Sequence, residues 1–245
     1  MNKGKRLLWL DVLRGLAMIN MLLYHALYDL VYLFQVPISW FGIQKSYAWQ
    51  QAICWCFILV SGISLRLSTR PWKNAIKILA GAVLLSVVTI TVMPSEAIYF
   101  GILHFLGCAI LITWFLLPLF RRIPAGVGGI LSFVLFLLTR SVPGRSYDIP
   151  YLFWLGFPDN GFTSADYFPL IPWIFLFWAG YFAGHYLLDR TRNEGQAEKE
   201  RTADKGFGLP GRLLGSIGRN SLLIYMLHQP IIYGLLWIWD NMFKQ

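Results

Sequence analysis

Four side chains capable of acid–base or ionic chemistry lie in the first apolar stretch of the chain: Asp11, Arg14, His25 and Asp29. In a helix that turns by about 100° per residue, all four fall within one sector of about 60°. A charge at the centre of a bilayer costs about 2.5–3.5 kcal/mol on insertion scales, so a charged residue inside an apolar span needs a partner or a function. The alignment therefore predicts a functional stripe on one face of the first helix.

The stripe has two ends. Asp11 and Arg14 are three residues apart, which allows an ion pair near the start of the span. His25 lies about 21 Å further along the helix axis, and Asp29 follows it by one helical turn. A carboxylate within reach of an imidazole fixes its tautomer and supports its protonated form, as acid–base catalysis requires. The structural alternatives are an interfacial ion pair at the first end and a helix–helix hydrogen bond at the second.

The last apolar stretch carries a second group of polar residues. They recur at roughly helical spacing and predict a stripe that faces protein or a water-filled cavity: Asn220, Ser221, Tyr225 and His228. Pro230 frees a backbone carbonyl one turn before it, which adds a further polar group. His104 lies at the start of another apolar stretch. It is either a second site residue or a packing residue.

The composition identifies the class of protein that must position these residues. The 245 residues are 57% hydrophobic and only 13% charged, against about a quarter charged in an ordinary globular domain. This excludes a disordered chain, a disulfide-rich secreted scaffold and a conventional soluble enzyme. The sequence predicts one transmembrane domain over residues 1–245. It shows no metal-ligand spacing, and the three cysteines are interpreted as small core residues.

The predicted fold is all-α: a polytopic transmembrane helix bundle with about seven spans, an eighth being left open, and a cytoplasmic N-terminus. Each span is an apolar run near the length that crosses a bilayer. The predicted spans are Leu7–Phe34, Ser46–Leu67, Ala75–Met93, Ala97–Phe120, Gly126–Thr139, Tyr167–Leu188 and Leu222–Trp239.

The orientation follows from the basic residues, which gather in the segments on the side of the N-terminus, as the positive-inside rule expects. The net charge of +9 is thus mostly a topology signal, and no nucleic-acid-reading motif accompanies it. The outer segment Arg140–Asp166 combines turn residues with aromatic ones and predicts a lid or a lipid-grazing loop. Residues 189–218 are interpreted as a charged, flexible cytoplasmic linker before the last span.

Several short motifs, in this order, resemble one family of membrane enzymes. The resemblance is to the transmembrane acyltransferases, and within them to the group related to the catalytic domain of heparan-α-glucosaminide N-acetyltransferase. The motifs are Leu10-Asp-Val-Leu-Arg-Gly-Leu-Ala with Tyr24-His25, Ser61-Gly-Ile-Ser-Leu, Gly101-Ile-Leu-His-Phe-Leu-Gly, Phe168-Pro-Leu-Ile-Pro-Trp, and Gly218-Arg-Asn-Ser-Leu-Leu-Ile-Tyr-Met-Leu-His-Gln-Pro.

The resemblance implies transfer of an acetyl group from cytosolic acetyl-CoA to an amine or hydroxyl on the outer side, with an amino sugar or envelope glycan as acceptor. The spacing of Arg14 and His25 is also similar to that in related O-acyltransferases, whose histidine is catalytic. The heparan enzyme's own active-site histidine lies further along this helix, where the present chain has Phe34, Gln35 and Val36. The resemblance therefore assigns catalysis to His25, with Asp29 as its partner.

The sequence thus predicts an acetyl-CoA-dependent acetyltransferase in the plasma (inner) membrane. We expect no metal cofactor and no nucleic-acid partner, and a homodimer is left open. Predicted acyl-donor residues are Asp11, Arg14, Ser61, Arg219, Asn220, Ser221, Tyr225, His228 and Gln229, and predicted acceptor-side residues are His104 and Trp173. Two alternatives use the same polar stripe: a small proton-coupled transporter, and a non-catalytic membrane scaffold.

Overall fold

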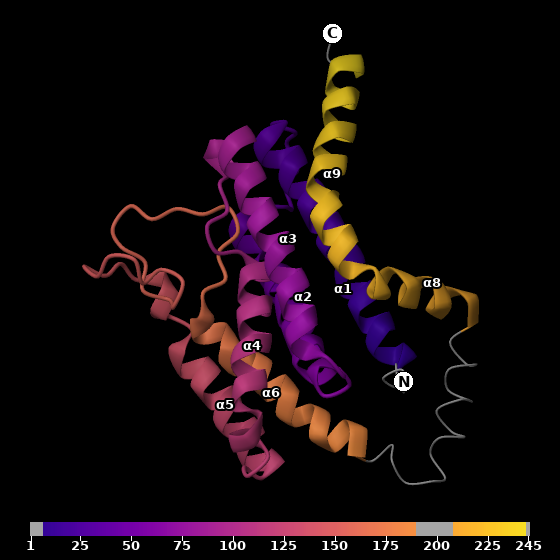
Figure 1. The fold of residues 1–245 in the computed structure, drawn as a ribbon. Helices are drawn as coiled ribbons and strands as arrows, with labels where there is room; N and C mark the ends of the chain where they lie inside the picture. The colour runs from indigo at the N-terminus through magenta and orange to yellow at the C-terminus, as the bar shows by residue number, and fades with distance from the viewer. Residues whose placement is uncertain (1–6, 190–207, 244–245) are drawn as a thin grey trace. The chain divides into compact units, whose positions relative to one another are not determined.

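The computed structural model describes residues 7–189 and 208–243. In this part of the chain the regular structure is helical, apart from one isolated bridge (Figure 1). The helices are α1 (Leu8–Tyr28), α2 (Ile43–Leu65), α3 (Pro71–Val92), α4 (Ile102–Phe120), α5 (Ala125–Thr139), α6 (Leu170–Asp189), α8 (Gly208–Arg219) and α9 (Ser221–Phe243). Short π or 3-10 turns are η1 (Asp29–Leu33), η2 (Pro94–Glu96) and η3 (Val142–Gly144).

Among the described residues, seven helices are long and apolar enough to cross a membrane, which confirms the predicted all-α polytopic class and its seven spans. The observed spans are Leu8–Leu33, Gln44–Leu65, Pro71–Val92, Ile102–Phe120, Ala125–Gly144, Leu170–Leu187 and Ser221–Met242. The fourth and sixth spans begin several residues later than predicted, because Phe100 and Tyr167 form a parallel bridge and their backbone is therefore extended, not helical.

The chain divides into two compact units. Residues 58–189 lie in one unit, while residues 7–57 and 208–243 lie in the other. Helix α2 contributes its first part to the second unit and its last turns to the first.

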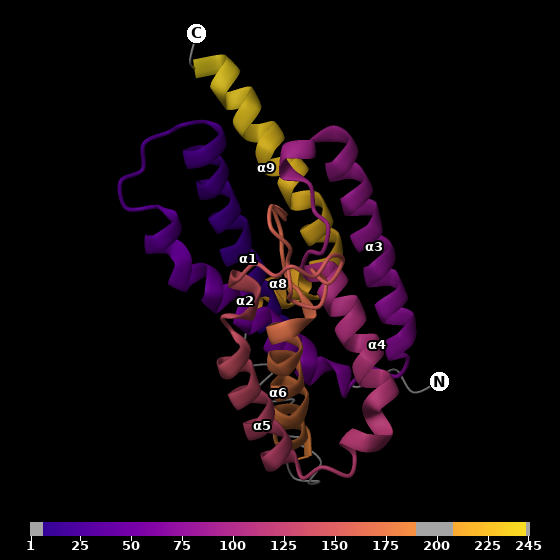
Figure 2. The same cartoon turned by 90° about the vertical axis from the view of Figure 1, so that its left-hand side faces the viewer.

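The unit of residues 58–189 is built on the helix pairs α3 with α4 and α5 with α6, and α4 also contacts α6 (Figure 2). Large apolar side chains fill its core, with Phe105, Phe136 and Phe177 almost completely buried. Trp178 Nε1 donates a hydrogen bond to the buried Thr113 Oγ1 at 3.0 Å, so both polar groups are satisfied inside the apolar packing.

Glycines allow close helix contacts in this unit. A Cβ atom at Gly62 would collide with the carbonyl oxygen of Phe177, so this glycine lets the last turns of α2 touch α6. At Gly128 a Cβ atom would lie 2.6 Å from Phe182 Cε1. The glycines that weaken the apolar pattern of α5 in the sequence thus serve its packing on α6, as small residues do in membrane bundles.

Hydrogen bonds connect the segment between α5 and α6 to the rest of this unit. Phe168 N donates to Phe100 O at 2.9 Å, and the Tyr167 hydroxyl donates to Phe153 O at 2.6 Å. Burial raises the pKa of Tyr167 to about 12, so its hydroxyl stays protonated and able to donate at neutral pH. Tyr151 remains 82% exposed on the same segment.

Asp166 connects this segment to the start of α4, because its Oδ2 accepts a hydrogen bond from the Ile102 backbone N–H at 2.9 Å. We expect Asp166→Ala to destabilise the protein by about 0.5–2 kcal/mol, the usual cost of losing a side-chain cap. Thermal unfolding in detergent measures this cost, with Asp148→Ala, at an exposed position of the same segment, as the control. Equal unfolding temperatures for the two variants would contradict the capping role.

One expectation about the linker needs correction. Residues 208–219 form helix α8, with buried glycines at positions 211, 215 and 218, where the sequence predicted a flexible linker. The glycines lowered the apparent helix propensity, but the helix is stabilised by its contact with α1. Residues 190–207 of the predicted linker lie outside the described residues. The three cysteines are half-buried rather than core residues.

In the unit of residues 7–57 and 208–243, α1 contacts α8, α9 and η1. The contact between α1 and α8 is backbone against backbone: a Cβ atom at Gly15 would collide with Leu214 O, and one at Gly218 with Asp11 O. Asn220 joins α8 to α9, and its side-chain Nδ2 donates to Ser216 O at 2.9 Å. In Figure 1, α8 runs across the direction of α9.

Candidate functional site

The first end of the predicted stripe forms an ion pair. Arg14 Nη1 donates to Asp11 Oδ1 at 2.6 Å, which joins the first and second turns of α1. Asp11 is only 6% exposed, so the pair lies against protein rather than in open solvent. The i,i+3 spacing of an α-helix produces this contact, as the sequence predicted.

Arg219, at the end of α8, lies beside this ion pair. The position that a Cβ atom of Gly215 would occupy is 3.4 Å from Arg219 Nη1 and 3.9 Å from Asp11 Cβ. The missing side chain at Gly215 therefore leaves room for the Arg219 guanidinium next to Asp11. Two arginines and one aspartate meet at this end of α1, with an excess of positive charge that suits a phosphate.

At the other end of the stripe, the α-helix gives way to a π turn. Asp29 begins η1, where Phe34 N donates to Asp29 O at 3.0 Å across five residues. The Asp29 side chain is 0% exposed. Gln229 Nε2, on α9, donates to both carboxylate oxygens of Asp29, at 3.0 Å to Oδ1 and 3.2 Å to Oδ2. Single π turns of this kind are frequent at functional sites.

Two histidines meet next to this carboxylate–amide contact. The ring centroids of His25 on α1 and His228 on α9 are 4.8 Å apart, in an edge-on arrangement. His228 Nδ1 hydrogen-bonds the carbonyl oxygen of Tyr225. Because a carbonyl oxygen can only accept, Nδ1 must carry the proton, which leaves Nε2 of a neutral His228 as an acceptor.

Two buried acceptor atoms in this cluster lack a hydrogen-bond partner among the described residues: His228 Nε2 and Gln229 Oε1. Asp29 orients the amide of Gln229, because its carboxylate accepts hydrogen bonds from Nε2. The Oε1 atom of the amide therefore points away from Asp29. Leaving such a group unpaired costs about 1–3 kcal/mol, and unpaired groups in native structures concentrate at sites that bind a ligand or do chemistry. We name His25, Asp29, His228 and Gln229 the α1–α9 polar cluster.

The structure pairs these residues differently from the expectation. The sequence predicted a contact between His25 and Asp29, but in the part of the chain that the structure describes His25 makes no hydrogen bond to Asp29 and its ring lies against His228. The physical reason is burial: the Asp29 carboxylate takes an amide donor from another helix, which a one-turn spacing in the sequence does not reveal.

The other residues of the predicted second stripe lie on or beside α9. The Tyr225 ring packs on His228 with centroids 5.2 Å apart, and Ser221 begins the helix. Asn220 is exposed and uses its side chain at the junction of α8 and α9. The structure thus brings Tyr225, His228 and Gln229 together with α1, and gives Asn220 a local role that spacing alone did not indicate.

Three predicted site residues belong to the unit of residues 58–189: Ser61, His104 and Trp173. His104 Nε2 lies 3.4 Å from Ser86 Oγ, and its ring stacks on Phe100 with centroids 5.6 Å apart. Trp173 packs between the rings of Phe136 and Phe168. Ser61 lies on α2, half-buried.

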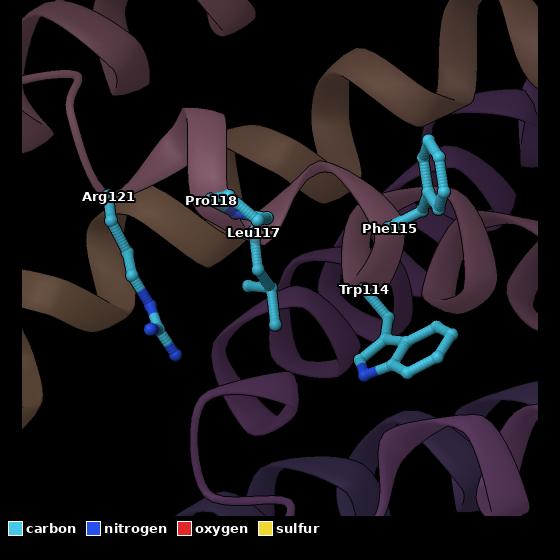
Figure 3. A pocket seen from close by; sticks show the side chains of 5 residues that line it. All are labelled: Trp114, Phe115, Leu117, Pro118 and Arg121. Atoms are coloured by element: carbon cyan, nitrogen blue, oxygen red, sulfur yellow. The ribbon is translucent and has the colours of Figure 1, made fainter.

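A hollow of about 310 Å³ lies along the second half of α4 (Figure 3). Its lining is apolar apart from one guanidinium and consists of Trp114, Phe115, Leu117, Pro118 and Arg121. Phe115 is 78% exposed on a helix that spans the membrane, so the hollow faces lipid. It offers no acid–base group beside Arg121 and is not the candidate site.

The contact between Asp29 and Gln229 leads to a prediction about stability. Gln229→Leu removes the amide that donates to the buried carboxylate of Asp29, and we expect a cost of about 1.5–3 kcal/mol, the range for hydrogen bonds to charged groups. The double variant Asp29→Leu/Gln229→Leu removes both polar groups and is expected to recover much of this cost. Unfolding temperatures of Gln229→Leu, Asp29→Leu and the double variant measure the coupling. Additive costs would contradict the pairing.

Comparison with known families identifies the chain. The family model for the catalytic region of heparan-alpha-glucosaminide N-acetyltransferase matches residues 6–230. Comparison with curated proteins and with solved structures gives no match. The matched range includes α1, the α1–α9 polar cluster and residues of both compact units. The chain is therefore a multi-pass membrane protein that belongs to the heparan-alpha-glucosaminide N-acetyltransferase catalytic family.

Proposed function

We propose that this protein transfers an acetyl group from cytosolic acetyl-CoA to an amine or hydroxyl of an amino sugar or glycan on the outer side of the plasma membrane. The observation that carries the proposal is the α1–α9 polar cluster, which places two histidines side by side within apolar spans. The family match favours this activity over a transporter or a scaffold that would use the same polar residues.

In the proposed reaction, His25 is the catalytic residue and acts as the general base. It takes the proton of the acceptor N–H or O–H, the acceptor atom forms a bond to the acetyl carbonyl carbon, and the thioester C–S bond breaks. The CoA thiolate leaves and receives the proton that His25 took from the acceptor, so CoA is released as the thiol. His228, whose Nδ1–H is held by Tyr225 O, can relay this proton, because its neighbouring Nε2 can accept it from His25 and pass it to the thiolate. In an alternative form of this mechanism, the acetyl group is first transferred to His25 and then to the acceptor.

The donor would enter from the end of α1 that carries Asp11 and Arg14. The arginines at this end, Arg14 and Arg219, are proposed to bind the CoA phosphates. Gln229, with its amide oriented by Asp29 and its oxygen unpartnered, can accept a hydrogen bond from an amide N–H of the pantetheine arm. Ser61, Asn220, Ser221 and Tyr225 are further proposed donor residues, and His104 and Trp173 are proposed acceptor residues.

The test uses purified protein in detergent with radiolabelled acetyl-CoA, with and without glucosamine or an envelope glycan fraction. Wild-type protein should release CoA and label the acceptor, and His25→Ala should do so far more slowly. His185→Ala is the matched control, because His185 is exposed near the end of α6 and lies outside the cluster. A wild-type protein that neither binds acetyl-CoA nor releases CoA with any acceptor would overturn the proposed function.

A further inference from the structure

Helix α8 has two different faces. At about 100° per residue, Gly211, Gly215 and Gly218 share one face, and Leu209 and Leu213 fall on the opposite one. The three glycines are buried, and Gly215 and Gly218 meet the backbone or side chains of α1. Leu209 is 71% and Leu213 59% exposed. One face of α8 is therefore used for packing within the protein, while the other presents leucines outward.

The position of α8 along its neighbours indicates what surrounds these leucines. α8 contacts α1 between Leu8 and Gly15, the first two turns of a membrane span, which is a depth of about 10 Å along the helix axis. It runs across the direction of α9, a second span that begins at Ser221 (Figure 1). A helix that crosses two spans at their ends lies at the boundary between the acyl chains and the headgroups.

The charges of α8 suit one leaflet surface. Between Gly208 and Arg219 the helix contains arginines at positions 212 and 219 and no acidic residue. Arg212 is exposed and falls about 100° from the glycine face, on the flank between the buried side and the leucines. Arg219 shares this flank but lies beside Asp11. An amphipathic helix with arginine on its flank and leucines beneath is suited to an anionic membrane surface.

We propose that α8 is an interfacial helix of the inner leaflet, with Leu209 and Leu213 among the acyl chains and Arg212 bound to the phosphates of anionic phospholipids. The glycine face then transmits this anchoring to the inner end of α1. The proposal depends on the membrane spans and not on the acetyl-transfer chemistry, so it stands or falls separately from the proposed function.

The experiment places a fluorophore on the exposed face of α8 in the full-length protein. In a variant with Cys54, Cys56 and Cys108 replaced by alanine, Leu213→Cys is labelled with NBD and reconstituted in nanodiscs. Leu131→Cys on α5, 55% exposed on a span, is the control for contact with lipid. Asn160→Cys, exposed in the outer segment, is the control for contact with water. Leu209→Cys provides a second position if the first variant does not fold.

We expect NBD at position 213 to be blue-shifted and quenched by doxyl-labelled lipid, as at position 131. Doxyl-labelled phosphatidylglycerol should quench it about two- to five-fold more strongly than doxyl-labelled phosphatidylcholine at the same mole fraction. Arg212→Gln should remove this preference and leave the quenching itself. A water-like spectrum would overturn the proposal, and so would a blue shift without lipid quenching, which would mean that protein covers the leucines. Equal quenching by the two lipids would overturn the anionic contact.

Discussion

His25→Ala is expected to lower the rate of acetyl transfer by about 10²–10⁴-fold, the usual contribution of a positioned general base. His228→Ala should cause a loss of similar order, because the two rings lie 4.8 Å apart and the proposed proton transfer uses both. The double variant His25→Ala/His228→Ala should be no slower than the slower single variant, since residues that act as a unit are not additive.

Initial rates of CoA release with saturating acceptor measure these effects, and His185→Ala provides the control. A loss in kcat without a matching rise in the KM for acetyl-CoA would place the defect in the chemical step. If the fold-loss in rate of the double variant equals the product of the two single fold-losses, the two histidines act independently. That result would contradict a shared proton path.

Gly218→Ala is expected to be among the most destabilising single-methyl changes in the chain. The added Cβ would collide with the carbonyl oxygen of Asp11, and a backbone atom cannot rotate away as a side chain can. Ordinary overpacking of a core costs about 1–3 kcal/mol. Because Gly218→Ala must push α8 away from α1, we expect its cost in unfolding free energy to reach or exceed the top of that range. It should also displace Asp11 and Arg14 and weaken binding of acetyl-CoA.

The matched control is Gly234→Ala, also in a helical segment, because nothing lies within 4 Å of a Cβ atom at that position. There the change from glycine to alanine should be neutral or slightly stabilising, since alanine has the higher helix propensity. Thermal unfolding of the two variants in the same detergent makes the comparison. Similar unfolding temperatures would contradict the backbone contact between α1 and α8.

The spans and the polar stripe could be predicted because both depend on local sequence. A run of about twenty apolar residues fixes a span, and a constant rotation per residue places Asp11 and Arg14 on one face. The ion pair between them follows from the same geometry and is present at 2.6 Å. The assignment of the family, which rests on short motifs in a fixed order, is confirmed over residues 6–230.

The partner of Asp29 could not be predicted, because it lies 200 residues away in the sequence. Local spacing offered His25, one turn before Asp29, whereas the fold supplies Gln229 on α9. The sequence predicted Gln229 as an acyl-donor residue, but not as the partner of Asp29. Its orientation by a buried carboxylate is a consequence of how α9 meets α1 and η1.

Helix α8 was missed for a related reason. Its glycines at positions 211, 215 and 218 lower the intrinsic helix propensity, so the segment resembles a linker in the sequence. Those glycines are what permits the backbone of α8 to touch that of α1. Propensity describes an isolated helix, and here the tertiary contact outweighs it.

The most direct test of the central claim, that the α1–α9 polar cluster is the catalytic site of acetyl transfer, measures binding and chemistry in the same variant. Purified wild type and His25→Ala are titrated with acetyl-CoA and then assayed for transfer to acceptor in a single turnover. We predict that His25→Ala binds acetyl-CoA with a Kd close to that of wild type and transfers the acetyl group about 10²–10⁴-fold more slowly. Transfer by His25→Ala at the wild-type rate would contradict the account.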